Sequence, residues 1–425
     1  MMSGMSAPRV IVVGQGYVGL PLAMRAVEVG FDVVGYDVAD ERIKALASGS
    51  SFVEDVGDDV LQGALGSGRY RPVSGFEGIT GFDVAVIAVP TPLREGAPDL
   101  SYIEEAAREL AGILQPGATV ILESTTYPGT TEELVAPILE AGSGLVAGRD
   151  FHLGYSPERI DPGNRTHTLV TTPKVVSGID TASLAAVAGF YDRIVDRTVP
   201  VSTPKTAELT KLLENTFRHV NVALVNELAM FANDLGLDMW EAIDAASTKP
   251  FGYLRFTPGP GVGGHCLPVD PSYLSWQVKR SLGQSFRFVE LANDVNDHMP
   301  DYVVRRLVVA LNREAKAVRG SRILLLGVSF KKNVGDCREA PSRRIARLLV
   351  DMGADLRAAD PHVDASDFPP GSTPVELSPD ELAAADIVVV LVDHDAFDQG
   401  EVLDHARCVL DARGWLPVQG NVERL

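Results

Sequence analysis

The sequence of residues 9–37 is RVIVVGQGYVGLPLAMRAVEVGFDVVGYD, and this stretch decides the fold. It begins with a short apolar run that is typical of a buried strand. A glycine-rich turn follows, and then a segment whose apolar residues have helical spacing. A second apolar run, FDVVGYD, occupies residues 31–37. A strand, a turn, a helix and a second strand in this order predict a βαβ unit with parallel strands.

The turn contains three glycines in the pattern GxGxxG. We expect Gly14 to permit the tight turn, Gly16 to let a pyrophosphate approach the backbone, and Gly19 to let the helix pack on the strand. Asp37 closes the second strand, where a carboxylate accepts hydrogen bonds from ribose hydroxyls and repels a 2′-phosphate. The unit therefore predicts NAD rather than NADP as cofactor. A glycine-rich turn without a ligand is the alternative.

Predicted strands and helices alternate from the N-terminus to about residue 200. The pattern then changes to a long helix over 208–234 and further helical segments. Strands return at residue 321, and the last predicted strand lies in residues 407–414. We therefore predict an α/β protein with two Rossmann-like domains, whose sheets are mostly parallel, joined by a central helical domain. The expected domain boundaries are 1–204, 205–315 and 316–425.

The composition narrows the class of protein. The chain has 425 residues, of which 45% are hydrophobic and 22% charged, as in ordinary globular proteins. A formal net charge of −19 argues against a nucleic-acid partner, although it allows an anionic small ligand. No apolar stretch is long enough to span a bilayer, and glycines interrupt the apolar N-terminus where a signal peptide would be continuous. We expect a cytoplasmic protein without a membrane partner.

Cys266 lies in an unusual stretch, PGPGVGGHCLPVDP, at residues 258–271. So much glycine and proline predicts irregular structure. The other cysteines are Cys337 and Cys408, and no CxxC pair occurs, so neither a disulfide framework nor a zinc site is indicated. We expect no bound metal. A chance thiol and a catalytic nucleophile both remain open at this point.

Three polar loops follow predicted strands, at residues 89–92, 123–131 and 155–164. In open α/β sheets the ligand crevice lies beyond the carboxyl ends of the strands, so these loops are candidates for binding a substrate. Routine capping of the loop backbone is the alternative for each of their polar side chains.

Seven stretches in order resemble the UDP-glucose/GDP-mannose dehydrogenase family of nucleotide-sugar 6-dehydrogenases, and the resemblance covers nearly the whole chain. The stretches are GQGYVGLP, VPTP, ESTTYPGTTEE, GYSPERIDPGN, AELTKLLENTFRHVNVALVNELA, PGPGVGGHCLPVDP and FKKNVGDCREAPS. The resemblance implies that two NAD⁺ oxidise the C6 alcohol of a UDP-sugar to a carboxylate, through a stage covalently bound to a cysteine. It also implies that the third domain binds UDP and that the central helices form a homodimer.

The resemblance assigns catalytic roles to six residues: Cys266, Lys211, Asn215, Asp270, Glu158 and Thr125. A thiolate adds to an aldehyde to give a thiohemiacetal, which becomes a thioester and is then hydrolysed. Lys211 and Asn215 are four residues apart on one helix face and would stabilise an oxyanion at C6. Asp270 would position or activate water, Glu158 would serve thioester hydrolysis, and Thr125 would orient water and contact the cofactor. His265 is expected to fill its loop, and assistance to the ionisation of the Cys266 thiol is the alternative.

The same resemblance gives two sets of binding residues. The expected cofactor-binding residues are Gly14, Gly16, Tyr17, Val18, Gly19, Asp37, Arg42, Pro90, Thr91, Glu123, Ser124, Thr125 and Arg338. The expected substrate-binding residues are Glu158, Arg159, Ile160, Lys211, Asn215, Arg218, Phe256, Gly261, Gly263, Gly264, Cys266, Phe330 and Lys332. Glu123 is expected on the nicotinamide side, Lys332 facing the nucleotide sugar, and Arg338 toward the cofactor pyrophosphate.

The motifs favour a UDP-N-acetylhexosamine as substrate, with UDP-N-acetylglucosamine first and UDP-N-acetylmannosamine next. Arg159 and Arg218 are not expected in typical UDP-glucose enzymes. UDP-glucose is the alternative substrate. A two-electron NAD dehydrogenase and an NAD-binding regulator are more distant alternatives, and the cysteine loop with the third domain argues against both.

Overall fold

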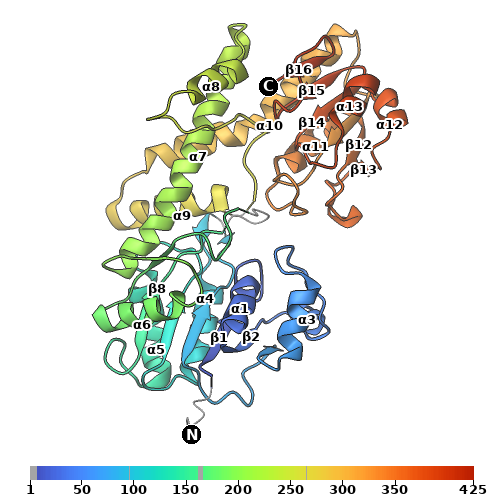
Figure 1. Ribbon diagram of the computed structural model, residues 1–425. Coiled ribbons are helices and arrows are strands. Elements are labelled where there is room, and N and C mark those ends of the chain that lie inside the picture. Colours follow the sequence, from blue (N-terminus) through green and yellow to red (C-terminus); the bar gives the residue numbers. More distant parts are fainter. Residues whose placement is uncertain (1–6, 95, 161–165, 265) are drawn as a thin grey trace. The chain divides into compact units, whose positions relative to one another are not determined.

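The computed structural model describes residues 7–94, 96–160, 166–264 and 266–425, apart from the side chains of residues 266 and 268. The chain divides into two compact units, Met1–Glu214 and Asn215–Leu425, which are described one at a time. The boundary falls inside the long helix α7 (Pro204–Asp234), drawn in green in Figure 1.

The first unit is built on a parallel six-stranded sheet with the order β3-β2-β1-β4-β7-β8, the Rossmann order. Its strands are β1 (Arg9–Val13), β2 (Asp32–Tyr36), β3 (Tyr70–Val73), β4 (Val84–Ile87), β7 (Thr119–Leu122) and β8 (His152–Tyr155). Two short pairs accompany it: β5 (Leu93–Arg94) with β6 (Ala97–Pro98), and β9 (Lys174–Val176) with β10 (Thr198–Pro200).

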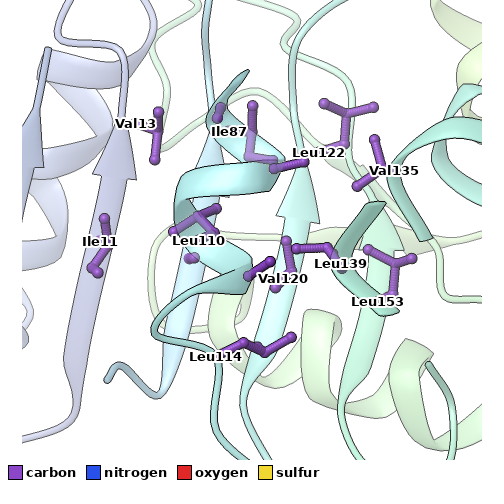
Figure 2. Close-up of a cluster of buried hydrophobic side chains, with 14 of the residues drawn as sticks. Ile11, Val13, Ile87, Leu110, Leu114, Val120, Leu122, Val135, Leu139 and Leu153 are labelled. Carbon is purple, nitrogen blue, oxygen red and sulfur yellow. The ribbon is translucent and has the colours of Figure 1, made fainter. Parts of the chain in front are cut away.

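Helices cover both faces of this sheet, because its strands are apolar on both sides. Ile11 and Val13 of β1 pack in one buried cluster with residues of α4 and α5, as Figure 2 shows, whereas Val10 and Val12 pack in the opposite cluster with α1 and α6. The helices of this unit are α1 (Gly19–Glu28), α2 (Asp40–Ala47), α3 (Asp58–Gly66), α4 (Ser101–Ala111), η1 (Thr131–Val135), α5 (Ala136–Ser143), α6 (Thr181–Tyr191) and the start of α7.

The second unit contains a second parallel six-stranded sheet, in the order β13-β12-β11-β14-β15-β16. Its strands are β11 (Arg322–Leu326), β12 (Asp355–Ala359), β13 (Thr373–Pro374), β14 (Ile387–Val390), β15 (Val409–Asp411) and β16 (Val422–Arg424). Its helices, after the rest of α7, are α8 (Met239–Ser247), α9 (Cys266–Leu282), α10 (Arg287–Arg313), α11 (Pro341–Asp351), η2 (Ala365–Asp367), α12 (Pro379–Ala384) and α13 (Gln399–His405).

The two sheets repeat the same turn after their first strand. The N–H of Gly14 donates to the Tyr36 carbonyl, and the N–H of Gly327 donates to the Ala359 carbonyl. Both glycines have positive φ, 93° and 79°, which other residues rarely adopt. The predicted fold class, two Rossmann-like sheets and a helical region with one long helix, is confirmed, whereas the three domain boundaries stay a prediction.

Helix α7 has two opposite and unusual faces. At 3.6 residues per turn, five of the six buried polar residues of this helix share an arc of about 80°. They are Glu208, Lys211, Asn215, His219 and Asn226. On the opposite side, exposed large apolar residues share an arc of about 100°. They are Leu209, Leu213, Phe217, Leu224, Leu228 and Phe231.

Three local predictions differ from the structure. Helix α7 begins at Pro204 rather than at Glu208, because proline is well tolerated in a first helical turn. The proline-rich stretch 258–271 was expected to be irregular throughout, but α9 begins within it, at Cys266, and contains Pro271. Strand β15 was expected to be the last strand, but β16 follows it at the sheet edge.

Candidate active site

The glycine-rich turn leaves room for a ligand where the sequence predicts the cofactor. A Cβ on Gly14 would lie 2.3 Å from the Ala88 carbonyl oxygen, and one on Gly19 would lie 1.8 Å from the Gly14 carbonyl oxygen. A Cβ on Gly16 would meet no described atom within 4 Å. Gly14 and Gly19 therefore serve close packing, and Gly16 faces open space, as the approach of a pyrophosphate requires.

The end of β2 presents a carboxylate next to this turn. Asp37 is buried and accepts hydrogen bonds from the N–H groups of Gln15 and Ala39, each at 2.9 Å. Arg42 lies 3.6 Å from the same carboxylate. Tyr17, which is exposed, and Val18, which is half-buried, lead into α1. These residues fit the adenosine half of NAD.

The loops after β4 and β7 are tied together by one hydroxyl. Ser124 Oγ accepts from the Val89 N–H at 2.9 Å and donates to the Val89 carbonyl at 2.8 Å. Pro90 is exposed, Thr91 is buried, and Thr125 is half-buried. Ser124 therefore has a structural task in addition to the cofactor contact predicted for it.

A buried ionic cluster lies at the carboxyl ends of β7 and β8. Lys174 Nζ donates to Glu123 Oε1 and, at 3.0 Å, to Glu158 Oε2. The Tyr191 hydroxyl donates to Glu123 Oε2 at 2.6 Å. Burial raises the pKa of Glu123 to about 7. Burial also opposes ionisation of Glu158, but Lys174, the hydrogen bond with Glu123, and Lys211 together lower its pKa well below the usual range.

Glu158 is held at both of its ends. Its Oε1 accepts the N–H groups of Arg159 and Ile160, each at 2.5 Å. Its backbone carbonyl accepts a hydrogen bond from Lys211 Nζ at 2.5 Å. Four predicted site residues are thus brought together at the end of β8. Of the polar loop at 155–164, the structure describes only residues up to Ile160.

The Arg159 guanidinium is engaged within the first unit. It donates to Glu214 on α7 at 2.6 Å and to the Pro173 carbonyl at 2.6 Å. Its predicted substrate contact would have to coexist with these bonds. Arg218, farther along α7, is exposed.

In the second unit, Asn215 Nδ2 donates to Asp270 Oδ2 at 2.6 Å, which joins α7 to α9. Both residues are buried. The Asn226 amide oxygen accepts the N–H of Gly259 at 2.9 Å and so holds the start of the cysteine stretch against α7. His265 and the Cys266 side chain lie outside what the structure describes.

The glycines before Cys266 pack tightly. A Cβ on Gly263 or on Gly264 would lie 2.8 Å from the Phe330 side chain, and the Gly264 N–H donates to the Arg338 carbonyl at 2.9 Å. A Cβ on Gly261 would lie 3.2 Å from Pro341. These glycines therefore let the stretch pack on the loop after β11, and clearance for a sugar would be an additional role.

A small cavity of about 30 Å³ lies beside this loop. Its lining residues are Pro260, Gly261, Ser329, Phe330, Lys331, Lys332, Pro341, Ser342, Leu391, Val392 and Arg413. Lys332 pairs with Asp395 at 2.7 Å, and that hydrogen bond raises the pKa of Lys332. Two predicted substrate residues, Phe330 and Lys332, therefore share a cavity with a third predicted residue, Gly261.

The remaining predicted side chains lie at the surface or in loops. Arg338 pairs with Asp336 at 2.6 Å in an exposed loop. Phe256 is half-buried and packs edge-on against Phe217 at 5.8 Å.

His394 is part of the loop framework of the second sheet. It is fully buried, its Nε2 lies 3.0 Å from Asp360 Oδ2, and its Nδ1 accepts the Asn333 N–H at 2.9 Å. These bonds fix the loop that carries Lys332. Among the residues that the structure describes, no three His, Cys, Asp or Glu side chains gather as a metal site would require.

Four residues that matter to this geometry were not predicted from the sequence: Lys174, Tyr191, Glu208 and Arg413. Lys174 and Tyr191 stand in apolar segments without any motif. Glu208 accepts from the N–H groups of Gly129 and Thr131, at 2.6 and 2.9 Å, and so ties the 123–131 loop to α7. The signal for Glu208 was available, since it shares a helix face with Lys211.

The Rossmann-type sheet, the open Gly16 and the buried Asp37 are typical of NAD-binding oxidoreductases. Within that class, the chain belongs to the UDP-glucose/GDP-mannose dehydrogenase family. The family's NAD-binding domain matches residues 8–195, its central domain matches residues 205–298, and its UDP-binding domain matches residues 324–417. NAD is therefore the cofactor, and the protein is a nucleotide-sugar dehydrogenase.

Relatives with named activities cover nearly the whole chain. UDP-N-acetyl-D-glucosamine 6-dehydrogenase of Pseudomonas aeruginosa is 38% identical over 395 residues, which is 92% of this chain and 91% of that protein. UDP-N-acetyl-D-mannosamine dehydrogenase of Pyrococcus horikoshii is 35% identical over 390 residues, which is 92% and 90% of the two chains. A solved structure of UDP-D-ManNAc dehydrogenase from Pyrococcus horikoshii superposes with a TM-score of 0.89, at 33% identity, and covers 98% of each chain.

None of the helices in the described parts of the chain combines the length and the hydrophobicity that crossing a membrane requires.

Proposed function

We propose that this protein oxidises the C6 hydroxymethyl group of a UDP-N-acetylhexosamine to a carboxylate, through a thiohemiacetal and a thioester on Cys266. UDP-N-acetylglucosamine is the favoured substrate and UDP-N-acetylmannosamine is next. The observation that carries the proposal is the polar face of α7, where Lys211 contacts the Glu158 carbonyl and Asn215 contacts Asp270. An ammonium and a carboxamide fixed one turn apart suit a developing oxyanion.

The overall reaction balances with two oxidants and one water. The alcohol, two NAD⁺ and water give the carboxylate, two NADH and three protons. NAD⁺, when bound, accepts the hydride that leaves C6 in each of the two oxidations. The Cys266 thiolate adds to the aldehyde carbon after the first oxidation and gives a thiohemiacetal. The second oxidation converts this thiohemiacetal to a thioester. Water then breaks the carbon–sulfur bond and regenerates the thiol.

Lys211 and Asn215 have the donors that the oxygen on C6 needs as it becomes negative. The Glu158 carbonyl accepts a hydrogen bond from one N–H of the Lys211 ammonium group, which leaves the other two N–H groups for the substrate. Asp270 accepts a hydrogen bond from the Asn215 amide, and this bond determines which amide atoms can turn toward the substrate. We assign water positioning to Asp270 and Thr125, and assistance to thioester hydrolysis to Glu158.

The preference for a 2-acetamido sugar rests on the named relatives and on the chain's own motifs. Relatives that act on UDP-N-acetylglucosamine and on UDP-N-acetylmannosamine each share more than a third of their aligned residues with this chain. The alternative is a UDP-glucose 6-dehydrogenase, and a solved UDP-glucose dehydrogenase from Pyrobaculum islandicum superposes with a TM-score of 0.84 at 28% identity. A two-electron NAD dehydrogenase is a more remote alternative.

We assign UDP to the surface around the small cavity beside the second sheet, because the cavity itself, at about 30 Å³, has room for about one water molecule. Lys332 and Arg413 line it with positive charge suited to a diphosphate, and Phe330 offers an aromatic face to the base or sugar. We also propose that the protein is a homodimer, because the exposed apolar face of α7 is long and continuous.

The test is an NADH-release assay with UDP-GlcNAc, UDP-ManNAc, UDP-GalNAc, UDP-glucose and GDP-mannose. We expect the highest kcat/KM with UDP-GlcNAc and at least a tenfold lower value with UDP-glucose, which corresponds to about 1.4 kcal/mol. The Cys266→Ala variant should form no acid, while Cys408→Ala should match the unmodified protein. No turnover with any of the five sugars would refute the proposed function, and acid formation by Cys266→Ala at the normal rate would refute the nucleophile.

A further inference from the structure

Lys174 lies at the centre of the buried cluster, and none of the catalytic steps above uses it. It projects from β9 and is 3% exposed, while Glu123 is 1% exposed. Its ammonium reaches carboxylates that follow two different strands, Glu123 after β7 and Glu158 after β8. A cation that is buried between two anions from separate loops fixes the distance between those loops.

We propose that Lys174 is a positioning residue for the oxidation: by holding the Glu158 carboxylate, it fixes the loop whose carbonyl orients the Lys211 ammonium. This inference rests on the proposed function, in which Lys211 stabilises the oxyanion. Lys174 does not touch the reacting atoms, and it acts through Glu158.

The contacts form a continuous chain from Lys174 to Lys211. Lys174 binds Glu158 Oε2, and Glu158 Oε1 accepts the N–H groups of Arg159 and Ile160. The loop is thereby folded around its own carboxylate. The Glu158 carbonyl is then aimed at Lys211 Nζ at 2.5 Å. Movement of the carboxylate would turn this carbonyl and release the ammonium.

The charges explain why a cation is needed at position 174. When Glu123 is ionised, the two carboxylates, Glu123 and Glu158, balance the charges of the two ammonium groups, Lys174 and Lys211, and the Tyr191 hydroxyl completes the hydrogen bonds of Glu123. Without Lys174, the Lys211 ammonium would be the remaining cation of this cluster. It would be drawn from the carbonyl toward a carboxylate, away from the position that the oxyanion requires.

Lys174→Met, which keeps the length of the side chain and removes its charge, is the principal variant. A misplacement of about 1 Å at a catalytic group costs about 100-fold, so we expect kcat to fall about 100-fold while the KM for NAD stays within threefold. Lys174→Arg should recover at least tenfold of that loss. Lys205→Met is the matched control, because Lys205 pairs with Glu133 at the surface, and it should keep normal kcat.

A double variant separates positioning from simple loss of stability. Glu123→Gln with Lys174→Met removes one anion together with the cation, so the protein should fold as well as the unmodified chain. Its kcat should stay below that of Glu123→Gln alone, because Glu158 still lacks its cation. Normal kcat in the double variant, or in Lys174→Met alone, would overturn the proposal.

A crystal structure of the double variant gives a readout that does not depend on activity. We expect Lys211 Nζ to lie more than 3.5 Å from the Glu158 carbonyl oxygen, and an unchanged contact would overturn the proposal. If the unmodified protein oxidises none of the sugars, the proposed function fails, and this distance alone decides whether Lys174 positions Lys211.

Discussion

The Asp37 carboxylate stands where the second strand meets the cofactor turn, and two backbone N–H groups hold it in place. Its charge is paired only with a half-exposed Arg42 at 3.6 Å among the described contacts. A fixed anion at this position accepts hydrogen bonds from ribose hydroxyls and repels a phosphate on the 2′-oxygen. We therefore propose that this one residue sets the choice of NAD over NADP.

Asp37→Asn tests this choice. The amide keeps an acceptor for the backbone but removes the charge, and hydrogen bonds to charged groups contribute about 1.5–3 kcal/mol. We expect the ratio of kcat/KM with NAD to kcat/KM with NADP to fall roughly 10- to 100-fold. Asp40→Asn, an exposed neighbour in the first turn of α2, is the control and should leave the ratio unchanged. An unaltered ratio in Asp37→Asn would show that the preference arises elsewhere.

Some residue roles were predictable from the sequence and others were not. Gly14, Gly16 and Gly19 act locally, within a single turn, so their pattern predicts their geometry. Lys174 and Glu123 become partners only because β9 brings the lysine to the ends of two other strands. That contact depends on tertiary packing, and no spacing in the sequence records it.

Helix α7 carries large apolar side chains on its exposed side, while its buried side holds polar side chains together with apolar ones. The sequence predicted the helix, but its apolar period does not show which of the apolar residues are buried. The structure separates them, because Leu212 and Val225 are buried while Leu213 and Leu224 are 63% and 52% exposed. Which side faces the core depends on the partners of the polar residues, which the period does not reveal.

The exposed stripe predicts the oligomeric state. Each leucine that becomes buried in a dimer contributes about 2 kcal/mol, so the unmodified protein should have twice the chain mass by light scattering. The double variant Leu224→Asp/Leu228→Asp should have the mass of a single chain. Val60→Asp, at an exposed apolar residue of α3, should stay dimeric. A monomeric unmodified protein at micromolar concentration would contradict the proposed dimer.

The buried side of α7 predicts a dependence of stability on pH. His219 is buried against α10, and its Nε2 lies 2.7 Å from the Asn293 amide oxygen. Burial lowers the pKa of His219, so the unfolded chain binds its proton more readily than the folded chain does. Stability is therefore full above about pH 6.5 and declines as pH falls from there toward the lowered folded pKa, by at most about 1.4 kcal/mol per pH unit.

The comparison is between the thermal midpoints of the unmodified protein and of His219→Gln at pH 7.5 and pH 5.5. The glutamine cannot take up a proton, so the variant should lose fewer degrees over this interval. An equal loss in both proteins would mean that His219 does not contribute to acid sensitivity.

For the whole molecule, the sequence predicted the fold class and the family because both depend on patterns that span the chain. The strand orders of the two sheets match the Rossmann expectation, and the family's three domains match in order. The identity of the sugar could not be derived in the same way. It depends on the shape of a pocket that side chains from distant segments form together.

The most direct test of the account is the stoichiometry of NADH formed per UDP-GlcNAc consumed, measured at completion with limiting sugar and excess NAD⁺. Four-electron oxidation through a Cys266 thioester predicts two NADH per sugar and the uronic acid as the sole sugar product. One NADH per sugar, with an aldehyde or ketone released, would contradict it.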